Sequence, residues 1–338
     1  MKILKSAIVF LLSILVLALI FIIYSDSPAD RNGETRAFNI NYGETAAAAG
    51  MRLKQQHFIR SASFFRLLTL IQHKETKIQP GQYTLSPSMN TQEILSVLTA
   101  HNGGQMDVRI TIPEGFTASE IAERMDEAGL CDYDEWMDIV SAPEAHFINL
   151  RSHEIESLEG FLFPDTYFFH HGAPCERYIQ KMTDRFFDIF TEKYINEAGQ
   201  QDFTLPEIVT LASLVEEEAK LKGERRTIAG VLRNRLEREM LLQCDATVQY
   251  ALPERKERLL YEDLKIDSPY NTYLYKGLPP GPICNPGLDS LLAALHPAAV
   301  PFLYYVARPD GSHIFSVSGE EHLDAVMKLR RERANKQY

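Results

Sequence analysis

Apolar positions between residues 208 and 222 recur at three- and four-residue spacing, the pattern of an amphipathic helix. The segment reads LASLVEEEA over residues 211–219, with three consecutive glutamates near its end. Glu218 follows Leu214 by four residues and Leu211 by seven, which places it on the apolar face of this helix. The spacing therefore predicts a carboxyl group on the buried face, near the end of the helix.

A carboxylate on a buried face costs free energy unless it is paired or used in chemistry. Desolvation raises the pKa of such a group, as a general acid near neutral pH requires. Glu216 is expected to point off the apolar face, and Glu217 to lie at its edge. We therefore expect Glu216→Gln to lower the activity only mildly. The alternative is an ordinary solvated run of acidic residues at a helix end.

An uncharged run of residues 6–25 predicts a transmembrane helix, since about 20 residues span a hydrocarbon core of about 30 Å. Lysines occur within residues 1–5, whereas Asp26 and Asp30 follow the run. The positive-inside rule then predicts a cytoplasmic N-terminus and an exported remainder. A cleaved signal peptide is the alternative, but its apolar region would be shorter and would end in an A-x-A exit.

The rest of the chain divides by composition into a tether and three larger parts. Residues 26–36 are polar and rich in turn formers, as in a tether. Residues 37–104 and 105–157 each combine a short β-type run, a glycine turn and an amphipathic helix, which predicts two small βα modules. In the second, Thr117 and Glu120 fit a capping box. Residues 158–338 are expected to form a mixed domain of helices and strands, so the whole chain is predicted to be α+β.

Local patterns within this last part predict its main elements. Helical spacing and turn signals alternate, and an Arg-Pro-Asp-Gly-Ser turn joins two β-type runs. The expected elements are helices over 177–198, 205–221 and 223–240, strands over 302–306 and 313–317, and a basic helical tail after residue 322.

The segment of residues 268–287 is a long loop rich in Pro, Gly, Asn and Tyr. Long irregular loops in compact domains are often functional. Tyr270, Asn271 and Tyr273 offer hydroxyl and amide groups and flat apolar faces, which are the groups that bind sugars. The alternative is a rigid loop whose tyrosines only pack.

Composition and charge narrow the class of partner. Hydrophobic residues make up 45% and charged residues 24% of the chain, as in ordinary globular proteins, and the net charge is −11. This acidic balance argues against nucleic acid as a partner. We expect no metal and no cofactor, because zincin spacing, a P-loop and a dinucleotide fingerprint are absent from the sequence.

The four cysteines are Cys131, Cys175, Cys244 and Cys284. No C-x-x-C spacing occurs, which argues against a zinc or thioredoxin-like site. One or two disulfides are permitted outside the cell, and the sequence does not choose among the pairings.

Several long segments occur in a fixed order: ITIPEGFTASEIAERM, LEGFLFPDTY, LASLVEEEAK, LQCDATVQYAL and SPYNTYLYKGLPPGPICNPG. Over about residues 108–324 the chain thereby strongly resembles the endolytic murein transglycosylases of the MltG/YceG-like family. The resemblance implies a single-pass protein of the cell inner membrane with its catalytic domain, residues 158–338, in the periplasm. It also implies LysM-like glycan-binding modules before that domain, although the first module matches loosely.

The implied activity is that of a carbon–oxygen lyase on nascent peptidoglycan strands. It cleaves β-1,4 bonds between MurNAc and GlcNAc, leaves 1,6-anhydro-MurNAc ends and terminates glycan elongation, with peptidoglycan synthases as possible partners. The family's catalytic glutamate is the last acid of a LASxxExE pattern, which falls on Glu218. Because the C6 hydroxyl of MurNAc is the nucleophile, one carboxyl group can protonate the leaving oxygen and then accept the hydroxyl proton.

Other candidate substrate-binding residues follow from the same segments. Asp245, Tyr270, Asn271 and Tyr273 are expected to position substrate. The aromatic stretch of residues 161–167, with Phe163 and Asp165, is expected to form with the loop a wall that keeps water out.

Two other functions stay open at this point. One is a non-catalytic anchored glycan-binding scaffold, and the other is a muramidase-type hydrolase with Asp165 or Asp245 as second carboxylate. The chain also departs from the usual family pattern at four positions. Glu217 stands where lysine is usual, and Cys244, Ala246 and Leu323 replace other frequent residues.

Overall fold

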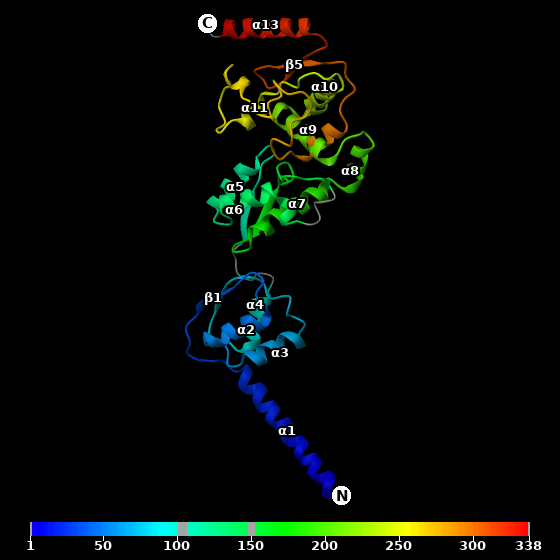
Figure 1. Cartoon of the computed structure of the whole chain (residues 1–338). Coiled ribbons are helices and arrows are strands. Elements are labelled where there is room, and N and C mark those ends of the chain that lie inside the picture. The colour runs from blue at the N-terminus through cyan, green and yellow to red at the C-terminus, as the bar shows by residue number, and fades with distance from the viewer. Residues whose placement is uncertain (1, 101–106, 148–152, 337–338) are drawn as a thin grey trace. The chain divides into compact units, whose positions relative to one another are not determined.

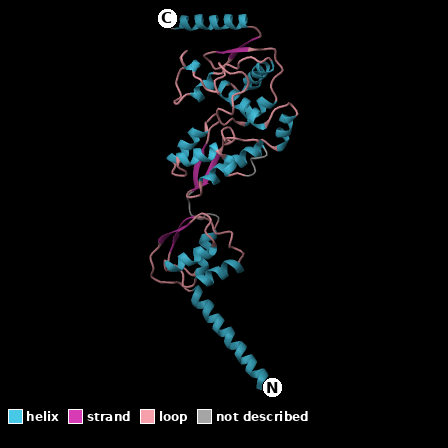
Figure 2. Cartoon of the chain, viewed as in Figure 1, coloured by secondary structure: helices cyan, strands magenta, loops and turns pink. Residues whose placement is uncertain are grey.

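The computed structural model describes residues 2–100, 107–147 and 153–336. Helices predominate, and the described residues form three two-stranded sheets, which confirms the α+β class (Figures 1 and 2). The chain divides into two compact units. The first comprises residues 1–108 with 168–173, and the second residues 109–167 with 174–338.

Helix α1 (Lys2–Asp26) includes the predicted membrane segment. Many of its large apolar side chains between Leu12 and Tyr24 are exposed. Across the described part of the chain, no helix meets the combined length and apolarity that crossing a membrane requires. The transmembrane helix of residues 6–25 stays a prediction. The end of α1 is fixed to the first module, because Thr91 Oγ1 donates to the Ser25 carbonyl at 2.9 Å.

The first module is a pair of antiparallel strands with three helices. Phe38 lies opposite Tyr83 in the strand pair, and alternate residues of each strand point into the core. The elements are β1 (Arg36–Ile40), α2 (Ala46–Gln55), α3 (Ala62–Ile71), β2 (Gly81–Leu85) and α4 (Thr91–Thr99).

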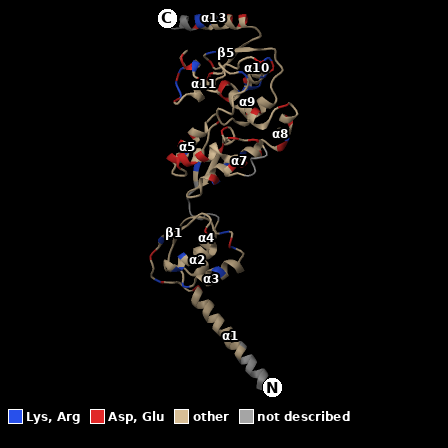
Figure 3. Ribbon diagram, viewed as in Figure 1, with Lys and Arg blue, Asp and Glu red and all other residues tan. Residues whose placement is uncertain are grey.

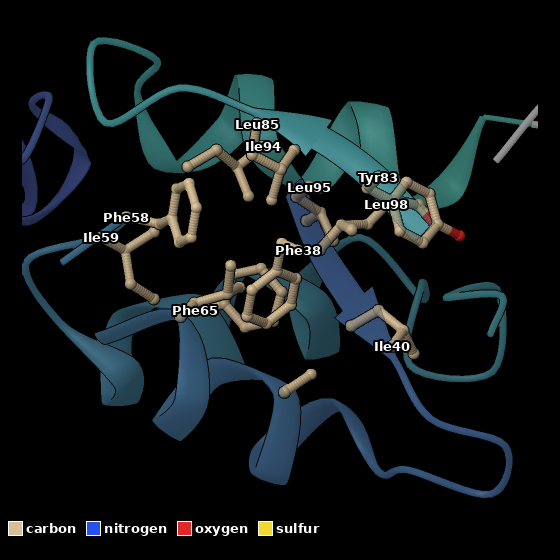
Figure 4. Packing of buried hydrophobic residues seen from close by; sticks show 12 residues of the cluster. Phe38, Ile40, Phe58, Ile59, Phe65, Tyr83, Leu85, Ile94, Leu95 and Leu98 are labelled. Carbon is tan, nitrogen blue, oxygen red and sulfur yellow. The ribbon is translucent and has the colours of Figure 1, made fainter. Parts of the chain in front are cut away.

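Side-chain caps and one apolar cluster hold this module together. Thr45, Ser61 and Asn90 each accept a backbone N–H at the start of a helix, which replaces a hydrogen bond that the helix cannot make itself. The helices and both strands share one hydrophobic core, shown in Figure 4. Its buried members include Phe38, Leu53, Phe58, Phe65, Tyr83, Leu85, Ile94 and Leu95.

A second strand–helix–helix–strand segment follows. It comprises β3 (Asp107–Thr111), α5 (Ala118–Glu127), α6 (Tyr133–Ser141), the 3₁₀ turn η1 (Pro143–Ala145) and β4 (Thr166–His170). β3 pairs with β4, which lies beyond residue 157, the predicted end of the second module. The predicted capping box of Thr117 and Glu120 is present at the start of α5.

A disulfide joins Cys131, just before α6, to Cys175, the first residue of α7 (Cys175–Ile189). Cys244 and Cys284 are free and buried. The structure thus makes the choice among pairings that the sequence left open.

The predicted helix of residues 177–198 is wrong in one respect, because two helices occupy the segment. Helix α7 ends before Phe190, and α8 (Glu192–Gly199) begins after it. The Phe190 ring is fully buried and stacks on Tyr194 with ring centres 5.3 Å apart. Burial of this ring explains the break, which helical spacing alone did not reveal.

The remaining elements follow the predicted order with shifted ends. The hairpin of β5 and β6 is confirmed, with Tyr305 opposite Phe315. The elements are α9 (Leu205–Glu218), η3 (Lys222–Glu224), α10 (Arg225–Glu237), α11 (Asp245–Ala251), η4 (Asp263–Lys265), α12 (Leu288–Leu295), β5 (Tyr304–Ala307), β6 (His313–Ser316) and α13 (Gly319–Lys336).

Helix α9 is the central helix of the second unit. It packs against α8, α10, α11 and α12, and every residue from Ile208 to Val215 is buried. The predicted amphipathic character is therefore wrong, because α9 has no solvent face over this stretch. Thr204 and Glu207 form a capping box at its start, so the helix is fixed at the end opposite Glu218.

Candidate active site

Glu218 is the last residue of α9 and is partly buried. Desolvation is the main cause that raises its pKa from 4.5 to about 7, and a hydrogen bond with the Tyr305 side chain acts in the opposite direction. A helix C-terminus carries partial negative charge, which also disfavours a carboxylate at this position. The group is therefore suited to holding and releasing a proton near neutral pH.

Three charged neighbours act on Glu218. Asp245 and Glu217 raise its pKa, and Arg235 lowers it. Arg235 is itself buried and donates to the backbone carbonyls of Leu303 at 2.6 Å and Leu242 at 2.8 Å. Its guanidinium is thus a fixed positive charge near the acid.

The loop of residues 268–287 contains neither helix nor strand, as predicted, and brings Tyr273 to this site. The Tyr273 hydroxyl donates to Asp245 Oδ1 at 2.6 Å. Burial raises the pKa of Tyr273, and Asp245 and Glu218 raise it further, so the hydroxyl remains a donor at neutral pH. Of the predicted site residues, Glu218, Asp245 and Tyr273 come together.

Asn271 has a different role from the predicted one. The residue is fully buried, and its side-chain amide donates to the carbonyls of Leu264 and Ile266. Its side-chain oxygen accepts the backbone N–H of Tyr273. The hydrogen-bonding groups of Asn271 therefore fix the loop, and its predicted contact with substrate is corrected to a role in holding Tyr273.

Phe163 and Asp165 also differ from their predicted roles. Phe163 is buried, as are Phe161 and Tyr167, so this stretch packs into the core and does not form an exposed wall. Asp165 pairs with Arg185 at 2.8 Å and accepts the backbone N–H of Thr166. The aromatic run belongs to the hydrophobic core rather than to a binding surface.

Glu159 is a second buried acid, which the sequence analysis missed. Desolvation raises its pKa from 4.5 to about 7. Its carboxyl group accepts from Ala118 N at 3.0 Å and from Asn285 Nδ2 at 3.0 Å, and the Tyr250 hydroxyl lies 3.3 Å away. The signal was present in LEGFLFPDTY, where an acid interrupts an apolar segment.

Glu159 lies on a cavity of about 610 Å³ in the second unit. Tyr250 also lines it, and the Tyr250 ring lies 4.9 Å from that of Tyr270, the remaining predicted loop residue. Ala246, next to Asp245, contributes to the wall, so the cavity and the Glu218 site share helix α11.

Glu216 contradicts the expectation that it points off the buried face. Its side chain is 7% exposed and pairs with Arg225 at 2.5 Å. It also accepts the backbone N–H of Gly287 at 3.0 Å. The cause of the error is the all-round burial of α9, which leaves no exposed face for Glu216.

One group of candidate metal ligands occurs in the described ranges, namely Cys131, Glu135 and Cys175. Its two cysteines are joined as a disulfide, so their sulfurs are not thiolates.

The site as a whole is that of an acid–base enzyme. One partly buried carboxyl group with a pKa near 7 is hydrogen-bonded to a tyrosine side chain and interacts with a buried guanidinium, and the adjacent residue, Glu217, lines a cavity of about 610 Å³.

Comparison with known proteins identifies the family. The sequence profile of the YceG-like family matches residues 38–328. The endolytic murein transglycosylase of Bacillus subtilis is 34% identical over 317 residues, covering 89% of this chain and 87% of that relative. That of Streptococcus pneumoniae is 29% identical, and the match covers 90% of this chain but 60% of the relative. The chain belongs to the YceG-like family.

A solved structure agrees with this membership. The 2.6 Å crystal structure of a YceG-like protein from Listeria monocytogenes is 32% identical and superposes with a TM-score of 0.60. The match covers 87% of this chain and all of that one.

Proposed function

We propose that this protein is an endolytic lytic transglycosylase, with Glu218 as its catalytic acid and base. The observation that carries the proposal is the position of Glu218 at the end of α9, where burial raises its pKa to about 7. Membership of a family with relatives named endolytic murein transglycosylase supports peptidoglycan as the substrate.

The proposed reaction needs one carboxyl group. Protonated Glu218 donates its proton to the oxygen that links MurNAc C1 to GlcNAc, and that C–O bond breaks. The C6 hydroxyl of the same MurNAc then bonds to C1 and gives its proton to the Glu218 carboxylate. The products are a 1,6-anhydro-MurNAc end and a free GlcNAc 4-hydroxyl, water is not consumed, and Glu218 ends protonated.

The neighbours of Glu218 support this cycle in different ways. Tyr305 orients the carboxyl group by its hydrogen bond. Arg235 favours the carboxylate stage, whereas Asp245 favours the protonated stage. Asp245 also accepts a hydrogen bond from the Tyr273 hydroxyl, which holds its carboxylate in place and supports a positioning role.

We also propose that α1 anchors the protein in the cell inner membrane with the rest of the chain in the periplasm. The exposed apolar side chains of α1 and a disulfide between Cys131 and Cys175 support this location. The modules before the catalytic domain then act as LysM-like glycan-binding units close to peptidoglycan synthases.

Mass spectrometry of digested, isolated peptidoglycan tests the proposed activity. We expect anhydro ends from the wild type and, for Glu218→Gln, a loss of roughly 10²–10⁴-fold, since the amide cannot donate a carboxyl proton. Glu237→Gln is a matched control, because the Glu237 side chain is 66% exposed on α10. Reducing ends would indicate a muramidase, and glycan binding without cleavage would indicate a scaffold.

A further inference from the structure

The cavity lined by Glu159 and Glu217 is acidic. Among its described lining residues, five are glutamates and one, Arg255, is basic. The glutamates are Glu120, Glu123, Glu159, Glu217 and Glu254. Carboxylates gathered around one cavity repel one another unless some of their negative charge is neutralised.

Arg255 is directed at one of these acids, the neighbour of Glu218. Arg255 Nη2 lies 2.6 Å from Glu217 Oε2. The Glu217 side chain is 15% exposed and that of Arg255 is 58% exposed. The pair therefore joins a mostly buried carboxylate on α9 to a guanidinium that approaches it from the solvent side.

The chain segment that carries Arg255 is itself held in place. The side-chain amide of Gln249, on α11, donates to the Lys256 carbonyl at 2.7 Å and accepts the Lys256 N–H at 3.0 Å. The Lys256 ammonium pairs with Asp263 at 2.5 Å. These contacts fix the backbone next to Arg255, so its position over Glu217 does not depend on the ion pair alone.

We propose that Arg255 is a positioning residue for the transglycosylase reaction, which neutralises Glu217 and so sets the charge that Glu218 experiences. This inference rests on the proposed function of Glu218. Arg255 acts through Glu217, and the segment from Leu252 to Arg255 is then a functional wall of the cavity.

The electrostatics of both acids agree with this role. Burial raises the pKa of Glu217, and Arg255 opposes that rise. Glu217 in turn raises the pKa of Glu218. Glu217 also interacts with Glu120, Glu216 and Cys284. Glu218 also interacts with Tyr305, Asp245, Arg235, Tyr273 and Cys244.

The pH dependence of kcat/KM for release of anhydro products tests the proposal, because it reports the protonation of the free enzyme's acid. Removal of a nearby positive charge makes Glu218 hold its proton to higher pH. For Arg255→Gln we expect the alkaline limb to move up by about half a pH unit, a value reduced by the exposure of Arg255. For Glu217→Gln we expect a similar movement downward.

The double variant Glu217→Gln/Arg255→Gln should return the limb close to its wild-type position, because the net charge change is zero. Arg255→Lys should also keep the wild-type limb, and the Arg255→Gln movement should shrink at high salt. Lys265→Gln is the matched control, since it removes an exposed positive charge that lies outside the cavity lining and is paired with Glu262.

Two results would overturn the proposal: an unmoved limb in folded Arg255→Gln, or an equal movement in Lys265→Gln. Circular dichroism and thermal unfolding of each variant establish that it is folded, and Arg255→Lys gives a second comparison if Arg255→Gln is not. A wild type without anhydro products would contradict the proposed function instead, so the two failures are distinguishable.

Discussion

At the scale of single residues, the three consecutive glutamates at the end of α9 have three different partners. Glu216 pairs with Arg225, Glu217 with Arg255, and Glu218 interacts with the Tyr305 side chain. Only Glu218 has a hydroxyl rather than a guanidinium as its nearest polar partner among these pairs. A hydroxyl partner does not force the carboxyl group to ionise, which leaves Glu218 free to exchange a proton.

The first residue-scale prediction concerns Glu216. Arg225 is buried and reaches Glu114 and Asp289 only at 3.3 and 3.4 Å, so Glu216 at 2.5 Å is its closest carboxylate. We expect Glu216→Ala to lower the free energy of unfolding by about 3–5 kcal/mol, because it leaves a buried charge without its main partner. Urea denaturation measures the change.

Glu237→Ala on the exposed side of α10 is the control and should change the free energy of unfolding by about 0.5 kcal/mol or less. A Glu216→Ala variant as stable as this control would show that the Arg225 pair is not a structural contact. A mild effect of Glu216→Gln on activity stays a prediction, but a side chain that points off the buried face no longer supports it.

The sequence predicts part of the site at this scale and misses part for a physical reason. Glu218 could be found because an acid on apolar spacing is visible locally. Asp245 and Tyr273 could be found because short polar segments of distinctive composition mark them. Arg235 and Tyr305 interact with Glu218 from α10 and from the distant strand β5, and no local pattern reveals such contacts.

At the scale of elements, local sequence signals predicted which helices and strands occur better than they predicted the residues at which these begin and end. The β5–β6 hairpin and the helix that carries Glu218 follow from turn residues and apolar spacing. The break between α7 and α8 depends on burial of the Phe190 ring, and the pairing of β3 with β4 joins distant segments. These features arise from tertiary packing, which spacing within one segment does not contain.

The element-scale prediction concerns α1. We expect the full chain to sediment with membranes and to dissolve only in detergent, whereas a variant lacking residues 1–24 stays in the soluble fraction. Deletion at residue 24 keeps the bond from Thr91 to the Ser25 carbonyl, so the first module retains its contact. Fractionation followed by immunoblotting measures the distribution.

A full-length control is Leu15→Asp/Leu19→Asp, which places charge within the apolar helix at a cost of about 2.5–3.5 kcal/mol per residue at a membrane centre. It should weaken membrane association without shortening the chain. A mature N-terminus near residue 29 would show instead that the segment is a cleaved signal peptide.

At the scale of the whole molecule, acidic residues outnumber basic ones by 46 to 35. Figure 3 shows acidic residues gathered on α5, whose side chains Glu120 and Glu123 also line the cavity. Two further acids, Glu159 and Glu218, carry less negative charge near neutral pH than exposed glutamates do, because burial raises both pKa values to about 7.

Protonation of these two acids links folding to pH. In the folded protein the pKa of each group is about 7, whereas the ordinary value is 4.5. Between these values the folded state binds protons that the unfolded state releases, so the free energy of unfolding falls as pH rises from about 4.5 to about 7. Asp263 and Asp310 have lowered pKa values, so they stabilise the folded state above their ordinary pKa of 3.8. That stability is lost only as the pH falls toward 3.8 and below.

The last prediction concerns the contribution of Glu159 alone, measured as the difference in stability between Glu159→Gln and the wild type. Glu159→Gln keeps a side-chain oxygen to accept from Ala118 N but cannot ionise. We expect its free energy of unfolding to increase relative to that of the wild type as the pH rises from about 5 to about 8, by roughly 3 kcal/mol at most, because only the wild type loses stability as Glu159 ionises. Urea denaturation across this range measures the difference, with exposed Glu237→Gln as a control that should follow the wild type. A difference between Glu159→Gln and the wild type that does not vary with pH would show that Glu159 is ionised in the folded protein throughout.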